Sequence, residues 1–301
     1  MMKKVICFLY ALNLVFFSFA QVAVKNLLCE NLSNPTGLDI QQPRFSWQLV
    51  SHARNVMQTA YEIRVSSNAS SIEKNKDIIW STGKISSDSS VHITYTGAPL
   101  ESGKKYFWQV RVWDNAGKAS AWSEPAFWQM GLLNANDWKA KWIEQGFAED
   151  AVQRTSPLFR KEFKTSKKIQ SATAYITAHG LYEACINGKR VGDYYLTPGW
   201  TNYNKRLQYQ TYDATNLLNE GSNAIGVELG NGWYRGYLAW GGNKNVYGKN
   251  VTLLFQLNIT YTDGTKETIV SDESWKCSTG NILNSEIYNG ETIDAGKEKT
   301  G

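Results

Sequence analysis

The chain has 301 residues, 42% of them hydrophobic and 20% charged, which is typical of a globular protein and argues against disorder. Its net charge is +5 and its Lys and Arg residues form no block, so a nucleic-acid partner is not expected. The length suits about two domains of ordinary size.

The first twenty residues have the pattern of a secretory signal peptide. Two lysines precede an apolar stretch at residues 5–17, and a Ser-Phe-Ala sequence ends at Ala20, directly before Gln21. The alternative is an uncleaved anchor, but the apolar stretch is short for a membrane span. We predict a signal peptide over residues 1–20, a secreted or periplasmic protein, and no membrane span after cleavage.

The remaining chain lacks familiar catalytic and metal-binding motifs. After cleavage it keeps Cys29, Cys185 and Cys277, an odd number that rules out a disulfide framework and allows one pair at most. The three histidines are isolated, and no spaced zinc ligands, nucleophile elbow or P-loop occurs. The residues therefore predict no catalytic site.

Residues 22–131 are predicted to form a first β-sandwich. Alternating apolar and polar residues at 44–50, 60–67 and 106–114 indicate strands, and Gly-containing turns separate them. Short strands with a turn about every 8–12 residues favour an antiparallel sandwich.

The later part of this region resembles a fibronectin type III domain. In "LESGKKYFWQVRVWDNAGKASAWSEPAFW", Leu100 precedes Tyr106 at the spacing of a tyrosine corner. The resemblance implies an Ig-like sandwich with Trp47 in its core. Because such domains usually act as spacers, we expect structural roles for residues before Gly131.

Residues 136–301 are predicted to form a second β-sandwich, a galactose-binding-like jelly roll. Alternation through residues 174–186 leads into Asn187-Gly188, a strong hairpin signal, and Asp263-Gly264 marks another turn. A single short helical segment is expected, capped by Asp213. The predicted fold class is thus all-β, with two antiparallel sandwiches in series.

The aromatic stretch "GNGWYRGYLAWGG" permits two interpretations, core packing or ligand contact. We predict a strand that turns Trp233 toward the core and Tyr234 and Arg235 the other way, where Arg235 stacks on or pairs across an interface. Trp240 is expected in a glycine-rich loop. Packing against a neighbouring domain is the first interpretation of its role, and contact with a sugar is the second.

Long motifs of the second region resemble those of bacterial α-L-rhamnosidases. They are "YEACINGKRVGDYYLTPGWTNYNKRLQYQTYD", "GNGWYRG" and "IYNGETIDA", within a match that covers nearly the whole mature chain. The resemblance implies a fibronectin-like domain, then this jelly roll, a further β domain and an α/α-barrel with the catalytic carboxylates. We expect that barrel beyond Gly301, an incomplete jelly roll, and no catalytic residue or hydrolysis in this segment alone.

Sugar binding needs flat rings flanked by amides or carboxylates. Some relatives bind rhamnose through calcium; that resemblance makes Asn187 a weak calcium-ligand candidate, because Ile186 stands where an acidic ligand is expected. The acidic group of Glu286, Glu291 and Asp294 is either a solvated turn or part of the barrel entrance. The candidate substrate-binding residues are Asn187, Trp200, Tyr203, Tyr234, Arg235, Trp240 and Glu291.

Three functions follow for testing. The first is the non-catalytic N-terminal region of a secreted, inverting α-L-rhamnosidase that acts on rhamnose-containing plant glycans, with its own downstream barrel as partner. The second is a stand-alone protein that binds rhamnosyl glycans without cleaving them. The third is a purely structural, adhesion-type β-array.

Overall fold

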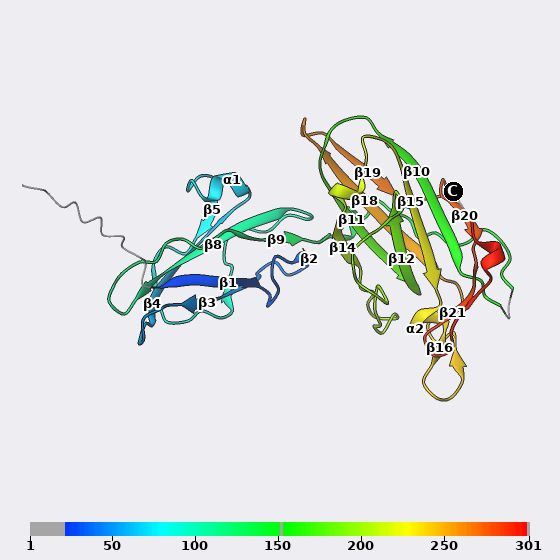
Figure 1. Ribbon diagram of the computed structural model, residues 1–301, viewed down its shortest axis with the longest axis horizontal. Coiled ribbons are helices and arrows are strands. Elements are labelled where there is room, and N and C mark those ends of the chain that lie inside the picture. Colours follow the sequence, from blue (N-terminus) through cyan, green and yellow to red (C-terminus); the bar gives the residue numbers. More distant parts are fainter. Residues whose placement is uncertain (1–21, 151–152, 300–301) are drawn as a thin grey trace, which may run out of the picture. The chain divides into compact units, whose positions relative to one another are not determined.

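The computed structural model describes residues 22–150 and 153–299, so the predicted signal peptide lies outside the described part (Figure 1). The chain forms two compact units. Of the described residues, the first contains 22–35, 41–99 and 105–128, and the second contains 36–40, 100–104, 129–150 and 153–299. No helix within the described part is long and apolar enough to cross a membrane.

The first unit contains two β-sheets. One has the order β1 (Ala23–Cys29), β3 (Arg44–Val50), β7 (Ile93–Thr94); the other has the order β9 (Ala126–Met130), β8 (Lys105–Asp114), β4 (Gln58–Ser66), β5 (Ile78–Ser81), with β6 (Ile85–Ser86) also on β4. Helix α1 (Ala69–Ile72) follows β4, and Asn68 caps it by accepting a hydrogen bond from the Ser70 amide. The predicted strands at 44–50 and 106–114 are confirmed.

The core of this unit is aromatic. Trp47 is 3% exposed and its indole N–H donates to Gln58 Oε1 at 3.0 Å, which confirms it as a core tryptophan. Phe45 packs against Trp108 with ring centroids 4.5 Å apart, and Tyr106 is also buried. Rings of this size supply much of the apolar area that the sheets bury.

The second unit is a sandwich of a five-stranded and a four-stranded sheet (Figure 1). Their orders are β13 (Lys189–Arg190), β12 (Leu181–Ile186), β15 (Gly221–Gly230), β10 (Pro157–Thr165), β20 (Lys276–Thr279), and β14 (Gln210–Asp213), β11 (Ile169–His179), β18 (Thr252–Tyr261), β19 (Lys266–Val270). Among the smaller elements, β2 (Thr36–Leu38) pairs in parallel with Gln129 and Met130, the last residues of β9, which belong to this unit. Two hairpins are formed by β16 (Tyr237–Leu238) with β17 (Asn243–Lys244) and by β21 (Ile282–Glu286) with β22 (Gly290–Ile293). Helix α2 (Gly232–Arg235) and 3-10 turns at Ala135–Asp137, Thr215–Leu217 and Ala295–Lys297 complete the unit.

The inward faces of the two sheets share one apolar core. Ile176 and Phe255 from the four-stranded sheet and Val227 and Leu229 from the five-stranded sheet belong to the same buried cluster. Burying each side chain of this kind stabilises the fold by roughly 1.5–3 kcal/mol. The period-two alternation therefore places every second residue of each strand in the core and leaves the others on the outer face.

The predicted turns of this unit are confirmed. Ile186 pairs with Lys189 across Asn187-Gly188, and Thr260 pairs with Lys266 across the Asp263-Gly264 turn. Asp213 accepts a hydrogen bond from the Thr215 amide at 3.0 Å, at the start of a 3-10 turn that is shorter than the predicted helical segment.

Cys29, Cys185 and Cys277 all carry free thiols.

Candidate functional site

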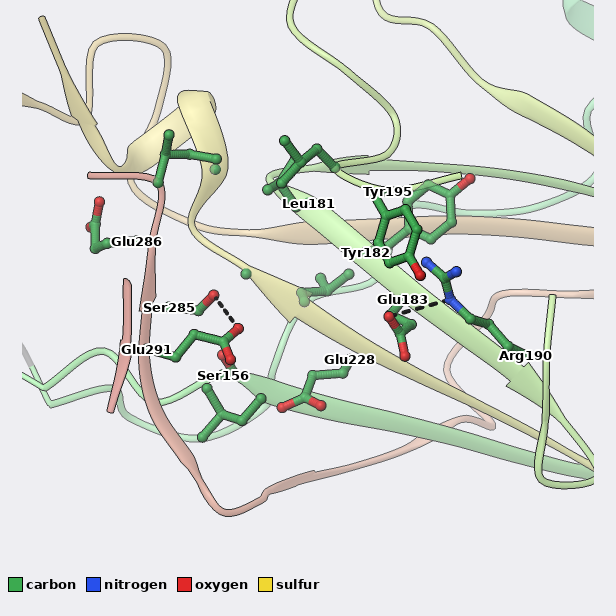
Figure 2. Close-up of a pocket in the computed structure, with 16 residues that line it drawn as sticks. Ser156, Leu181, Tyr182, Glu183, Arg190, Tyr195, Glu228, Ser285, Glu286 and Glu291 are labelled. Atoms are coloured by element: carbon green, nitrogen blue, oxygen red, sulfur yellow. Dashed lines mark hydrogen bonds and ion pairs between the residues drawn. The ribbon is translucent and has the colours of Figure 1, made fainter. Parts of the chain in front are cut away.

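A cavity of about 530 Å³ opens on the outer face of the five-stranded sheet (Figure 2). Strands β12 and β15 form its floor, and hairpin β21–β22 forms one wall. Its lining combines apolar, aromatic and acidic side chains, and Arg190 is the one basic residue among the described residues that line it.

The floor is open because of the residue pattern of β15. Ile225, Val227 and Leu229 point into the core, so Gly226, Glu228 and Gly230 occupy the outer face. A Cβ at Gly226 would meet no atom within 4 Å, whereas one at Gly230 would lie 3.1 Å from Ser285 Oγ. Because Gly226 and Gly230 have no side chains, none flanks Glu228 on the outer face of β15, and the β21–β22 hairpin can approach the sheet.

Glu228 is the central acidic group of the cavity. It is the direct cross-strand partner of Glu183, and in the view of Figure 2 it lies between Glu183 and Glu291. Its Oε1 atom is buried and has no hydrogen-bond partner among the described residues. Burial, followed by the charges of Glu291 and Glu183, raises the pKa of Glu228 to about 7.

Arg190 and Tyr195 form the side of the cavity next to Glu183. Arg190 Nε lies 3.4 Å from Glu183 Oε2, and its guanidinium lies 4.3 Å from the centre of the Tyr195 ring. Arg190 also donates to the Tyr194 carbonyl at 2.6 Å. The ring of Tyr195 is 80% exposed, so one aromatic surface is presented to solvent beside the acidic floor.

The wall of the cavity is held by a buried polar network. Glu286, at the end of β21, accepts hydrogen bonds from Asn231 Nδ2 and from the Tyr237 amide, both at 3.1 Å. Arg235 is 1% exposed, donates to Asn231 Oδ1, and forms an ion pair with Glu149 at 2.7 Å. Buried pairs of this kind fix geometry, because either charge alone would be costly to bury.

One predicted site residue lies in the cavity and one lies behind its wall. Glu291 lines the cavity and accepts from Ser285 Oγ at 3.1 Å. Arg235 supports the wall from inside the unit; it was predicted to pair across an interface, and this is corrected by its burial and its pair with Glu149.

Asn187 lies at the β12–β13 turn and outside the cavity. Its Nδ2 donates to Leu217 O at 2.9 Å and to Asn223 Oδ1 at 2.8 Å, and its Oδ1 accepts from the Ala224 amide at 2.9 Å. Its φ of +52° is one that Asn tolerates well. These bonds give Asn187 a structural role in joining the hairpin to β15.

The stretch around Trp233 is helical, which corrects the predicted strand. Gly232 has a φ of +54°, and a Cβ there would lie 2.6 Å from Leu181 Cγ, so the chain turns sharply into α2. Trp233 is half-buried and stacks on the exposed ring of Trp200 at 6.0 Å. Trp240 is fully exposed, at 103%.

Tyr203 and Tyr234 belong to a cluster of aromatic rings with Trp142, His179 and Tyr247. Trp142 stacks on His179 at 4.4 Å, His179 stacks on Tyr234 at 4.6 Å, and Tyr203 meets Tyr234 edge-on at 5.4 Å. Tyr203 also donates to the Gly199 carbonyl at 2.9 Å. The structure thus brings Tyr203 and Tyr234 together and places Trp200 against Trp233, whereas Trp240 is exposed. None of the predicted aromatic site residues lines the cavity of Glu291.

Comparison with known families accounts for both units. Residues 24–134 match the Rha78A-like N-terminal immunoglobulin domain, and residues 167–301 match the α-L-rhamnosidase N-terminal domain. The chain therefore carries an α-L-rhamnosidase N-terminal domain preceded by a Rha78A-like immunoglobulin domain.

Individual rhamnosidases resemble the chain over nearly its whole length. An α-L-rhamnosidase of Formosa agariphila is 41% identical over 286 residues, which are 92% of this chain and 31% of the relative. Two solved α-L-rhamnosidases confirm the all-β fold: that of Dictyoglumus thermophilum (40% identity, TM-score 0.84, 92% of this chain and 32% of that one) and that of Streptomyces avermitilis complexed with L-rhamnose (27%, 0.86, 93% and 43%). The chain therefore spans about a third of the length of the rhamnosidases it matches.

Sequence reasoning missed four residues of the cavity: Glu183, Arg190, Tyr195 and Glu228. The available signal was the alternation Gly-x-Glu-x-Gly at residues 226–230, which places one carboxylate between two glycines on a single strand face. Glu286, Glu291 and Asp294 are close together in sequence, whereas Glu183 and Glu228 are distant in sequence and meet through strand pairing.

Metal-binding groups are sparse in the described part of the chain. Among residues 22–150 and 153–299, no group of three or more His, Cys, Asp or Glu side chains is arranged to hold a metal ion.

Proposed function

We propose that the chain is the non-catalytic N-terminal region of an α-L-rhamnosidase that releases terminal α-L-rhamnose from plant polysaccharides or glycosides with inversion. The match to the Formosa agariphila enzyme carries this proposal, because 41% identity extends over 286 residues and both units. About two thirds of that relative lies outside the match, which leaves room for a separate catalytic domain.

In this proposal the two units act as a scaffold. Inverting glycosidases use two carboxyl groups about 6.5–9.5 Å apart, one of them protonated near neutral pH. Glu228 has a suitably raised pKa, but its neighbour Glu183 is paired with Arg190 on an outer sheet face. We therefore assign catalysis to a downstream barrel and a supporting role at the substrate entrance to this chain.

The decisive experiment compares two proteins on p-nitrophenyl α-L-rhamnopyranoside. The first is the 301-residue chain, and the second is the product of the same reading frame continued past Gly301. The proposal expects release of p-nitrophenol by the longer protein alone. Release by the 301-residue chain, or a stop codon directly after Gly301, would contradict it.

The predicted signal peptide supports export of this protein. We propose cleavage after Ala20, giving a secreted or periplasmic product. N-terminal sequencing of the exported protein should begin at Gln21, and retention of the lysine-rich start would show that the segment is not removed.

A stand-alone glycan-binding protein is the second candidate. The observation that favours it is the exposure of Trp200 and Trp240, at 53% and 103%, because rings in contact with solvent suit sugar faces. A true stop codon after Gly301, together with retention on a rhamnogalacturonan gel, would select this function.

A further inference from the structure

The Glu228 cavity has the composition of a small-molecule binding site. Its volume of about 530 Å³ falls within the range of roughly 300–1,000 Å³ seen for ligand pockets. Leu181, Leu196 and Ile282 give it apolar surface. Gly226 and Gly230 carry no side chain on the outer face of β15, on either side of Glu228. It is separate from Asn187, which is not among its lining residues.

The polar groups of the cavity are mainly hydrogen-bond acceptors. Glu228 and Glu291 supply carboxylates to the cavity. Glu183 is paired with Arg190, and Glu286 already accepts from Asn231 and Tyr237. A buried acceptor without a partner, such as Glu228 Oε1, is costly in the free protein. A ligand that brings several hydrogen-bond donors would remove that cost.

Two kinds of ligand could satisfy these carboxylates, a metal cation or a molecule rich in hydroxyl groups. The described residues contain no arrangement of three or more acidic, Cys or His ligands suited to a metal. In contrast, the exposed Tyr195 ring beside the acidic floor suits a ligand with one apolar and one hydroxylated side. A sugar ring has both properties.

We propose that this cavity binds a neutral pyranose ring, with Glu228 accepting hydrogen bonds from adjacent hydroxyl groups and Tyr195 contacting the apolar face of the ring. Glu291, held by Ser285, receives a further hydroxyl. The site lies on the second unit of this chain, and the proposed binding requires no metal. It relies on the proposed function only for the choice of L-rhamnose as the first probe.

The test is isothermal titration of the 301-residue chain at about pH 8 with L-rhamnose, D-galactose and D-glucose, each with and without EDTA. Binding of at least one sugar is expected. Glu228→Gln should weaken it by about tenfold or more, because a charge-assisted acceptor is lost. The matched control is Glu220→Gln, which changes an exposed carboxylate outside the cavity and should leave affinity within about twofold.

A second variant guards against an indirect effect of the first. Tyr195→Ala removes an exposed ring, so the fold should be preserved while affinity falls by about tenfold. The proposal is overturned if none of the three sugars binds, or if both variants bind as tightly as the parent chain. Binding that disappears with EDTA and ignores Glu228→Gln would also overturn it. Hydrolysis by the longer protein is measured separately, so failure of the sugar-binding proposal can be distinguished from failure of the proposed function.

Discussion

Glu183 and Glu228 are paired directly across strands β12 and β15, so two carboxyl groups share one patch of sheet. Like charges in this position normally destabilise a sheet. Arg190 pairs with Glu183, while the raised pKa of Glu228, about 7, reflects burial and the charges of Glu291 and Glu183. The arrangement lowers stability at the place where we propose that ligand binds.

Glu228→Gln should stabilise the protein at about pH 8. In the unfolded chain the Glu228 pKa returns to about 4.5, so the folded state binds the extra proton and loses stability as pH rises from about 4.5 to about 7. After discounting for solvent screening we expect a gain of about 1–2 kcal/mol at pH 8 and almost none at pH 4. Thermal unfolding at the two pH values measures this, and an equal change in Tm at both would contradict it.

Gly192→Ala should destabilise more than Gly188→Ala. Both glycines have a φ of +75°, so both substitutions carry the same backbone cost of about 1 kcal/mol. A Cβ at Gly188 meets open space, whereas one at Gly192 would lie 2.2 Å from the Tyr212 ring. We expect an additional loss of about 1–3 kcal/mol for Gly192→Ala in urea unfolding. Equal losses would show that the ring moves freely aside.

Arg235→Met should lower the free energy of unfolding by about 3 kcal/mol, because it leaves Glu149 and Asn231 without their buried partner. Arg160→Met is the matched control. It breaks an exposed pair with Glu162, and its loss should stay below about 1 kcal/mol. Urea unfolding followed by tryptophan fluorescence compares the two, and similar losses would argue against an energetic role of the buried pair.

His179→Phe should reduce the loss of folding stability that occurs as the pH falls below about 6.5. Burial between two rings lowers the pKa of His179 below its usual 6.5, so the neutral form is favoured in the folded state. Stability is therefore lost as pH falls through about 6.5 toward the lower folded pKa. Lowering the pH from about 7.5 to about 5 should reduce the Tm of the variant less than it reduces the Tm of the parent chain. An unchanged difference would mean that His179 does not titrate in this interval.

Local patterns predicted most of the fold. The alternation of residues 44–50 coincides with β3, and Asn187-Gly188 and Asp263-Gly264 stand at hairpin turns. Each signal is contained in a few neighbouring residues, because side-chain alternation and turn chemistry are local properties.

The cavity and α2 depend on contacts distant in sequence. Trp233 was expected on a strand, but the chain forms α2 there, and Gly232 begins it with a positive φ at a point where Leu181 leaves no room for a Cβ. Glu183 and Glu228 are 45 positions apart, and only strand order and register bring them together. Aromatic composition indicated that sugar contact was worth considering, but it could not show which rings stack on one another and which face solvent.

The aromatic contacts among Trp142, His179, Tyr234 and Tyr203 join segments that are far apart along the chain. Loops joined in this way lose their conformational entropy when the protein folds, and not when a ligand binds. Any molecule that docks against this end of the sandwich would therefore meet a surface already set in shape, and would spend little of its binding energy on restraining the protein.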